Sequence, residues 1–438
     1  MTTTLLLLIA EGGLISCTAF LLLVMAGAVR FRREQSKALE APAARPKAAD
    51  AGKLKADNSG KQKAGGTEKL EADRVKFPAV TLLKPLHGME PEMEAKLESF
   101  FRQDYPEFEI VFGARDADDP ALAVVRELQI RYPQTRVKVE YSGRPAKPNA
   151  KVYLLSKMMG AAANDYLVIS DSDVRVGPDY LREVVRPLLD PAVGLVTCVY
   201  RGVSTGTIWS RLEALGMSVE MTSGVLVADL LEGMKFALGP TMAVRREVLE
   251  SVAHWPDLAD YCADDYVLGD AVYKSGMKVV LSHYVIDHFA NNRGWKDSIL
   301  HQIRWAKSTR FSRPWGHPAT VLTFAMPFGL LGMAAAFFAG RPQLAIALIA
   351  WALLNRVLLA VVTGWGCLGD RSSLIYSWLY PVRDFMGFLF WASSFFGREI
   401  VWRTERYRLE YGGKMARSEA SGGKECEYEK IVVLSRGS

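Results

Sequence analysis

Cysteine is scarce in this sequence, and its cysteines form no metal-binding pattern. Five are scattered over 438 residues without any C-x-x-C pair: Cys17, Cys198, Cys262, Cys367 and Cys426. Zinc and redox sites commonly use closely spaced cysteines, and disulfide frameworks belong to small secreted domains. The sequence therefore argues against both kinds of site and fits a reducing compartment.

Two further motifs are missing. No G-x-G-x-x-G follows the first predicted strand, so a dinucleotide-binding fold of the usual kind is not supported. No nucleic-acid-binding motif is present, and we expect no nucleic-acid partner. The net charge of +6 arises from 54 basic and 48 acidic residues. Because basic residues flank the apolar segments, this charge favours an anionic membrane surface as the partner.

Residues 1–33 are predicted to form an N-terminal transmembrane anchor. Leu5–Val29 is apolar and long enough to cross the hydrocarbon core of a bilayer. Arg30, Arg32 and Arg33 follow at once, so the positive-inside rule puts the rest of the chain in the cytoplasm. A cleaved signal peptide is the alternative, but its basic residues would precede the apolar run.

Residues 34–76 are predicted to be a flexible, charged linker. The segment is rich in Ala, Lys, Glu and Gly, and no aromatic residue occurs before Phe77. A segment of this composition cannot bury a hydrophobic core.

Three apolar segments within residues 313–400 are predicted to be transmembrane or interfacial helices. Pro318–Gly340 is an apolar run without a charged side chain and predicts a spanning helix. Leu344–Val362 also predicts a span, with Arg356 facing a neighbouring helix or reaching the interface. Ser373–Phe396 is interrupted by Pro and an Arg-Asp pair, and it either spans or lies in the interface.

Residues 401–438 are predicted to be a basic tail. Its Arg and Lys residues would prefer the cytoplasmic face, whereas four full spans would put the tail on the other face. We therefore expect one of the later apolar segments not to cross fully. The sequence predicts an integral, multi-pass membrane protein whose central domain faces the cytoplasm.

Residues 77–312 have the pattern of an α/β domain. Apolar runs predict strands at 77–83, 108–112, 137–141, 167–170, 194–200 and 279–281. Helical spacing predicts helices at 93–101, 121–132, 151–163, 264–275 and 295–310, and a long helical or mixed segment at 209–231. Strands that alternate with helices favour a parallel, Rossmann-like sheet.

Acidic residues follow two of these strands. Asp171 and Asp173 come directly after the apolar run Leu167–Ile169, and Asp116 follows the second strand. Ligands of open α/β sheets bind beyond the carboxyl ends of the strands, and parallel strands end at one edge. Carboxylates suit Mg²⁺ or Mn²⁺, so the pair predicts a metal site. A polar turn is the alternative.

Two later stretches complete the candidate site. Asp264 and Asp265 begin a helix, where acidic residues are also expected from the helix dipole alone. Arg304 and Trp305 lie on a basic helix, where they could equally form a pair that reaches the membrane interface.

These motifs, taken in order, resemble those of membrane-bound glycosyltransferases with the D, D, D, (Q/R)-x-x-R-W signature. The chain is most similar to the ceramide glucosyltransferase group, glycosyltransferase family 21, which includes bacterial relatives that glycosylate hopanoid lipids. The resemblance covers residues 77–312 and lies in Leu82–Gly88, Arg115–Pro120, Asn149–Lys151, Ser170–Asp173, Ala263–Tyr266 and Gln302–Trp305. It implies a GT-A-like catalytic domain with a Rossmann-type mixed sheet, flanked by N-terminal and C-terminal transmembrane helices.

The resemblance also implies roles for residues near the donor. Asp116 would contact the base or ribose of a UDP-sugar, and Lys84 and Pro85 would line the same pocket. Asn149 and Lys151 would face the uridine or the phosphates.

Further roles concern the chemistry. The resemblance implies that Asp171 and Asp173 bind Mg²⁺ or Mn²⁺, and that Asp265 is the general base with Asp264 beside it. In the last matching stretch, Gln302, Arg304 and Trp305 would hold the diphosphate of the donor and close the site on the side of the acceptor.

The implied activity is transfer of a hexose, with glucose favoured, from a UDP-sugar to the hydroxyl of a membrane lipid with inversion. A ceramide-type acceptor is favoured. One departure matters: animal members carry a functional His where this chain has Glu220 or Thr222 nearby. N-acetylglucosamine transfer to a hopanoid lipid is therefore an alternative. A polysaccharide synthase would need more membrane helices, and a non-catalytic membrane scaffold or lipid-binding protein would not need the acidic motifs.

Overall fold

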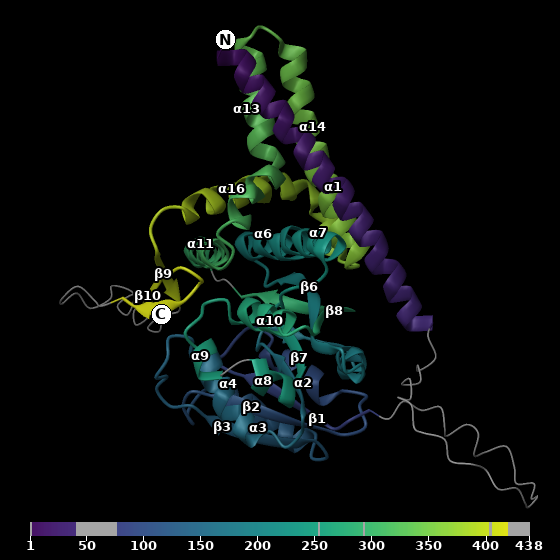
Figure 1. Ribbon diagram of the computed structural model, residues 1–438, viewed down its shortest axis with the longest axis vertical. Helices are drawn as coiled ribbons and strands as arrows, with labels where there is room; N and C mark the ends of the chain where they lie inside the picture. The colour runs from purple at the N-terminus through teal and green to yellow at the C-terminus, as the bar shows by residue number, and fades with distance from the viewer. Residues whose placement is uncertain (1, 41–76, 253–254, 292–293, 403–404, 419–438) are drawn as a thin grey trace, which may run out of the picture.

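The computed structural model of the protein describes residues 2–40, 77–252, 255–291, 294–402 and 405–418. Figure 1 shows an α/β domain below a bundle of apolar helices, with a small β-sheet at one side of the domain. Most of the predicted linker, from residue 41 onward, and the end of the predicted tail lie outside the described residues.

An eight-stranded mixed sheet forms the centre of the α/β domain, with the strand order β3-β2-β1-β4-β7-β6-β8-β5. Its strands are β1 (Val80–Pro85), β2 (Phe108–Ala114), β3 (Arg136–Tyr141), β4 (Tyr166–Ser170), β5 (Val174–Arg175), β6 (Val193–Ser204), β7 (Thr241–Arg245) and β8 (Lys278–Ala290). The first four are parallel, as predicted. β7 runs antiparallel to both of its neighbours, which makes the sheet mixed.

Helices cover the two faces of this sheet. They are α2 (Met93–Phe101), α3 (Ala121–Arg131), α4 (Ala150–Ala161), α5 (Tyr180–Val185), α8 (Arg246–Val252), α9 (Trp255–Leu258) and α10 (Asp264–Lys274). α2 shows why they form: Met93, Leu97, Phe100 and Phe101 recur at helical spacing and are all buried. β1 and β4 are buried on both faces, as parallel strands under helices should be.

A long apolar helical segment lies on the membrane side of the sheet. It consists of α6 (Ile208–Leu215), the π-helical turn η2 (Gly216–Met221) and α7 (Thr222–Glu232). The segment is long and apolar enough to cross a membrane. Instead, α6 packs so closely on β6 that a Cβ at Gly202 would lie 2.3 Å from the Ala214 carbonyl oxygen. In Figure 1 the segment runs across the direction of the helices above it.

The bundle above contains α1 (Thr2–Glu40), α13 (Ala325–Phe338) and α14 (Pro342–Ala360), which continues as the π-helical η4 (Val361–Cys367). Three helices in the described ranges are long and apolar enough to span a membrane, two of them α1 and α14 with η4. A fourth span arises if the short helices at Gly316–Thr323, α12 and η3, join α13 across a 57° bend. The predicted helix from residue 318 to 340 is therefore bent rather than straight.

The third predicted apolar segment contains α15 (Arg371–Ile375), η5 (Ser377–Leu379) and α16 (Tyr380–Ser394). α16 is not among the candidate spans of the described residues. It packs between α13 and α14 on one side and α6 and α11 (Trp295–Ser312) on the other. Whether this segment spans or lies in the interface stays a prediction.

The segment predicted to be a basic tail forms a three-stranded antiparallel sheet. Its strands are β9 (Glu399–Trp402), β10 (Glu405–Leu409) and β11 (Met415–Arg417). Buried side chains alternate in this sheet and pack on Cys262 and Phe311. Because Arg and Glu occupy the outward positions between them, the composition alone resembled that of a charged tail.

A buried ion pair joins α14 to α16. Arg356 Nη1 lies 2.9 Å from Asp384 Oδ1, and both side chains are almost fully buried. Arg356 also donates to the Thr323 carbonyl oxygen at 2.8 Å, and the Met326 N–H donates to Asp384 at 2.9 Å. Arg356 therefore faces a neighbouring helix rather than the interface, and the pair fixes the bend before α13.

We predict that Arg356→Met destabilises the protein by about 3 kcal/mol, because it leaves the buried Asp384 carboxylate without its cation. The double variant Arg356→Met/Asp384→Leu should recover most of that loss. The stability of both variants is measured by thermal unfolding of the purified protein in detergent, with size-exclusion chromatography as the detection of folded protein. Equal stability of the single variant and the wild type would contradict this account of the bend.

Candidate active site

A cavity of about 620 Å³ opens at the carboxyl ends of the parallel strands. Most of its lining comes from the loops after β1 to β4, the first turns of α4 and α10, one face of α11, and the C-terminal sheet. Further lining residues come from β6, η2, the turn before β7, and β8. Sites for small molecules typically have this size. The predicted residues that line it are Pro85, Lys151, Asp171, Asp173, Asp264, Asp265, Arg304 and Trp305.

The turn after β4 carries two carboxylates, each of which faces a cation. Lys151 Nζ, from the first turn of α4, lies 2.5 Å from Asp171 Oδ1. His288 Nε2 lies 3.2 Å from Asp173 Oδ2. The strand register explains the second contact, because β5 pairs with β8 so that Val174 faces His288.

Two lysines lie behind this turn, in the protein interior. Lys84 is fully buried, and its Nζ donates to the Asp171 carbonyl oxygen at 2.5 Å and to Ser170 Oγ at 3.3 Å. Lys96 Nζ lies 2.6 Å from Glu90, which in turn accepts a bond of 2.7 Å from Ser172 Oγ. Lys84 therefore supports the acidic turn from behind and is not among the residues that line the cavity.

These cations decide how the buried carboxylates ionise. Burial alone would raise the pKa of Asp173, but His288, Lys96 and Lys84 together lower it below the ordinary value. The pKa of Asp171 stays raised, because burial and the charge of Asp173 outweigh the attraction of Lys151.

The turn has an incomplete set of metal ligands. Asp173 Oδ1 is buried, yet it has no hydrogen-bond partner among the described residues. Within the same ranges, no group of three or more His, Cys, Asp or Glu side chains is already arranged around a metal position. Asp171 Oδ1 likewise accepts no hydrogen bond there, although it faces Lys151. Two carboxylates with such oxygens fit a divalent ion that takes its remaining ligands from water and a bound substrate.

The two acids at the start of α10 have different surroundings. Asp264 Oδ1 accepts a bond of 3.0 Å from Asn149 Nδ2. Asp265 Oδ2 accepts from the Gly239 N–H at 2.7 Å. Burial and the neighbouring Asp264 charge raise the pKa of Asp265 to about 6, although Lys151 opposes the shift. Asp265 thus has the pKa of a group that exchanges protons near neutral pH.

Asn149 has a structural position rather than one on the cavity wall. Its side chain accepts from the Val152 N–H at 3.1 Å and so caps the start of α4, in addition to holding Asp264. It does not line the cavity. The cap therefore orients the first turn of α4, which carries Lys151.

One face of α11 supplies the opposite wall. The Arg304 guanidinium packs 5.0 Å from the centre of the Trp402 ring. Among the described residues, no carboxylate lies within ion-pair distance of it, so its charge is available to an anion in the cavity. Burial lowers the pKa of Arg304, but a guanidinium remains protonated.

Gln302 is turned away from the cavity and toward the membrane helices. Its Oε1 accepts a bond of 2.8 Å from Arg383 Nη2 on α16, and Arg383 also lies 2.8 Å from Glu220 Oε2 on η2. Gln302 is buried and is not among the lining residues. It links α11 to α16 and, through Arg383, to η2.

Asp116 lies beside the cavity rather than in its lining. Its carboxylate is more than half exposed and lies 3.4 Å from Arg115, which does line the cavity. The predicted proximity of the strand ends is correct, since β2 and β4 both pair with β1 in parallel.

Several lining residues could not be anticipated from the sequence. They are His288, His301, Trp402, Glu405, Tyr407 and Arg417. The two histidines stand in no recognisable motif, and the others belong to the sheet that was interpreted as a tail. Arg417 Nη2 donates to the Pro145 carbonyl oxygen at 3.1 Å, so this sheet closes the cavity over the loop after β3.

The mixed sheet and the acidic turn at its strand ends are features of a glycosyltransferase with a GT-A-like catalytic domain. The helices around that domain include candidates for membrane spans at the N-terminus and in the C-terminal region.

The chain belongs to glycosyl transferase family 21, whose family model matches residues 56–415. Ceramide glucosyltransferase 1 of Caenorhabditis elegans is 23% identical over 377 residues, which cover 84% of this chain and 79% of the relative. Ceramide glucosyltransferase of Komagataella phaffii is 38% identical over 101 residues, 22% of this chain and 20% of the relative. The protein is therefore a sugar-transferring enzyme.

Among solved structures, the mannosyltransferase PcManGT from Pyrobaculum calidifontis, in complex with GDP-Man and Mn²⁺, is similar to this chain. It has 21% sequence identity and a TM-score of 0.43, and the match covers 73% of this chain and 88% of that one. These values are too low for the similarity to bear on function.

The contact between Gly239 and Asp265 yields a prediction. A Cβ at Gly239 would lie 3.1 Å from Asp265 Oδ2, where it would push the carboxylate off the Gly239 N–H. We expect Gly239→Ala to lower kcat of sugar transfer about tenfold, because a small displacement of a reacting group has a large effect on rate. Steady-state kinetics measure the change.

Gly160→Ala is the matched control, since a Cβ there meets no atom within 4 Å. It should keep wild-type kcat. If Gly239→Ala also kept wild-type kcat, the position of the Asp265 carboxylate would not depend on this contact.

Proposed function

We propose that the protein transfers a hexose, with glucose favoured, from a UDP-sugar to the hydroxyl of a membrane lipid, with inversion at the anomeric carbon. A ceramide-type lipid is the favoured acceptor, because the similar curated proteins are named ceramide glucosyltransferases. The observation that carries the proposal is the cavity itself: a carboxylate of raised pKa and an unpaired guanidinium face the same space as the acidic turn.

The nucleotide occupies the end of the cavity over β1, β2 and β3 in this proposal. Pro85, Arg115 and Ser142 line that end. Asp116, beside Arg115, is within reach of a ribose or base there. The C-terminal sheet covers this end through Arg417, which ties it to the loop after β3.

The diphosphate lies between the acidic turn and α11. Asp171 and Asp173 would hold a divalent ion, Mg²⁺ or Mn²⁺, and His288 would orient Asp173 from behind. That ion supplies positive charge to the departing diphosphate. Arg304 faces the same group with a planar fork of donors that matches phosphate oxygens. Lys151, which lies 2.5 Å from Asp171, would add a further cation on the donor side.

Asp265 acts as the general base. It takes the proton of the acceptor hydroxyl while the hydroxyl oxygen attacks the anomeric carbon, and the bond from that carbon to UDP breaks on the opposite face. UDP leaves with the electron pair of the broken bond. Asp264, held by Asn149, keeps the pKa of Asp265 raised through its charge.

The acceptor enters from the membrane side. Met221 of η2 lines the cavity and is partly exposed, so it connects the cavity with the apolar segment below the membrane helices. In this proposal the catalytic domain of a multi-pass protein lies on the cytoplasmic face. The basic residues that follow the first apolar run, Arg30, Arg32 and Arg33, support that orientation.

N-acetylglucosamine transfer to a hopanoid lipid is the second candidate. It is favoured by the absence of a His where animal members carry one: Glu220 pairs with Arg383 and Thr222 is buried. Assays with UDP-glucose and UDP-N-acetylglucosamine, each against ceramide and a hopanoid alcohol, separate the two. A scaffold without activity would transfer neither sugar.

We predict that Asp265→Asn lowers kcat at least a hundredfold with labelled UDP-glucose and lipid acceptor, because the amide cannot take the proton. In the wild type, kcat/KM should fall as the pH drops below about 6, where Asp265 becomes protonated, and level off above it. Unchanged turnover in the variant would remove Asp265 from the role of base.

Metal dependence gives a second prediction. Excess EDTA should abolish most transfer, and Mn²⁺ or Mg²⁺ should restore it, because Asp171 and Asp173 are placed for a divalent ion. His288→Ala should raise the Mn²⁺ concentration for half-maximal activity about tenfold. His283→Ala, which lies outside the cavity lining, is the control. Full activity in excess EDTA would contradict the metal assignment.

A further inference from the structure

A second histidine faces the cavity, and the mechanism above does not use it. His301 lies on α11, one turn before Arg304, and its side chain is 31% exposed. Its ring centre lies 4.4 Å from that of Trp305, which lines the cavity beside it. His301 and Trp305 therefore form one continuous patch on the cavity wall.

Glu213 fixes the orientation of this ring. Glu213 Oε1, from α6, lies 2.7 Å from His301 Nδ1, and its other oxygen accepts a bond of 2.8 Å from Ser298 Oγ. The Glu213 side chain is only 1% exposed. Burial would raise its pKa, but His301, Ser298 and Arg383 lower it, so the carboxylate is charged. A buried, charged carboxylate on Nδ1 makes that nitrogen the proton donor and leaves Nε2 for another partner.

Nε2 of His301 has no hydrogen-bond partner in the part of the chain that the structure describes. Among the described residues, the hydrogen bond that Nδ1 donates to Glu213 is the one found for the His301 ring. The ring nevertheless lines the cavity, so Nε2 is the polar atom that this part of the wall offers to a bound molecule.

The position of His301 assigns it to the acceptor end. The strand ends of β1, β2 and β3 and the C-terminal sheet enclose the opposite end of the cavity. His301 instead lies where α11 meets α6, the helix that belongs to the apolar segment on the membrane side of the sheet. Figure 1 shows α11 and α6 side by side directly below α16. A lipid headgroup that enters past Met221 reaches this end first.

We propose that His301 binds the polar headgroup of the acceptor lipid through Nε2, with Glu213 as the positioning residue that orients the ring. The acceptor class that fits carries a second hydrogen-bonding group, a hydroxyl or an amide, next to the hydroxyl that reacts. Trp305 packs against the apolar part of the same headgroup. This inference rests on the proposed lipid acceptor and adds which side chain recognises it.

Two substitutions separate acceptor binding from a purely structural role. In His301→Asn, the side-chain amide can still reach Glu213 from the position of Nδ1, but nothing remains at the position of Nε2. In His301→Gln, the longer side chain puts an amide near the position of Nε2. A bond that only anchors α11 to α6 would be kept in the Asn variant, whereas a bond to the acceptor would be lost.

The test uses the full chain in detergent micelles, with labelled UDP-glucose and a short-chain ceramide. His301→Asn should raise KM for ceramide about tenfold, the effect of one lost hydrogen bond. KM for UDP-glucose and the slow hydrolysis of UDP-glucose without acceptor should stay at wild-type values. His301→Gln should recover most of the ceramide affinity, and Glu213→Gln should raise KM for ceramide without changing donor hydrolysis.

His283→Asn is the matched control, since His283 pairs with Glu34 at 3.2 Å but does not line the cavity. It should behave as the wild type. A wild-type KM for ceramide in His301→Asn, or an equal rise of KM for UDP-glucose, would overturn the acceptor role of His301. If the wild type transferred glucose to no ceramide, the proposed function itself would fail first.

Discussion

The site depends on the neutralisation of two carboxylates that are taken out of water one residue apart. Unpaired, buried carboxylates would take up protons and lose the charge that binds a metal. Lys84, Lys96 and His288 prevent this at Asp173, and Lys151 opposes it at Asp171. Each of these cations comes from a different element: β1, α2, β8 and α4. The acidic turn therefore requires β1, α2, α4 and β8 to be folded around it. This requirement explains why lysines are tolerated in the core.

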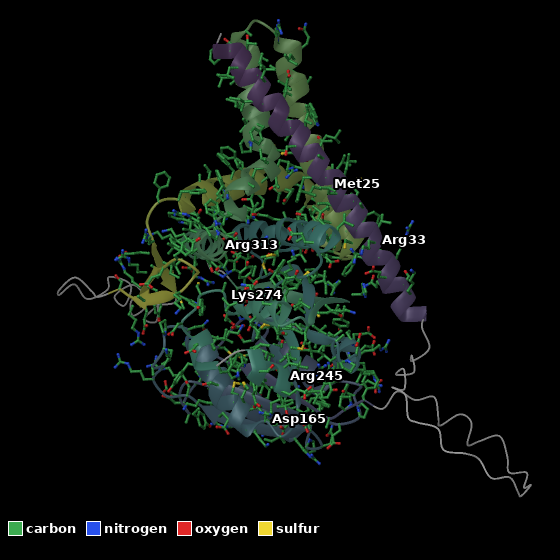
Figure 2. The ribbon with its side chains drawn as sticks, viewed as in Figure 1. Met25, Arg33, Asp165, Arg245, Lys274 and Arg313 are labelled. Atoms are coloured by element: carbon green, nitrogen blue, oxygen red, sulfur yellow. The ribbon has the colours of Figure 1, made fainter. Side chains whose placement is uncertain are left out.

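A second set of charges connects this site with the membrane helices. Gln302 and Glu220 both contact Arg383, and Arg356 pairs with Asp384 one residue further along α16. On α16, Arg383 therefore contacts α11, and the next residue, Asp384, contacts α14. Because buried polar groups need partners, the position of α11, and with it Arg304 and Trp305, is tied to the arrangement of the helices above. Figure 2 shows the dense layer of side chains between the two parts.

The sequence predicted the parts of the fold whose pattern is local. The first four strands and α2 follow from apolar runs and helical spacing, and the edge at which the acidic motifs meet follows from parallel pairing. β7 escaped prediction because it is five residues long and follows the Gly239–Pro240 turn. The C-terminal sheet escaped because its outward Arg and Glu residues hide the alternation of its buried ones.

The roles of single site residues were harder to predict than the motifs. Lys84, Asn149 and Gln302 stand in the matching motifs, yet they support lining residues from behind. A motif marks which residues a site requires, but tertiary contacts decide which of them face the cavity. His288 reaches the acidic turn only through the pairing of β5 with β8, which no local pattern reveals.

The central claim is that this cavity joins a sugar to a membrane lipid with Asp265 as base. Mass spectrometry of lipids from cells that express the chain, compared with cells that express Asp265→Asn, tests it most directly. The account predicts a lipid heavier by one sugar residue in the first cells and its loss in the second. Identical lipid profiles, with both proteins present in equal amounts in the membrane fraction, would contradict it.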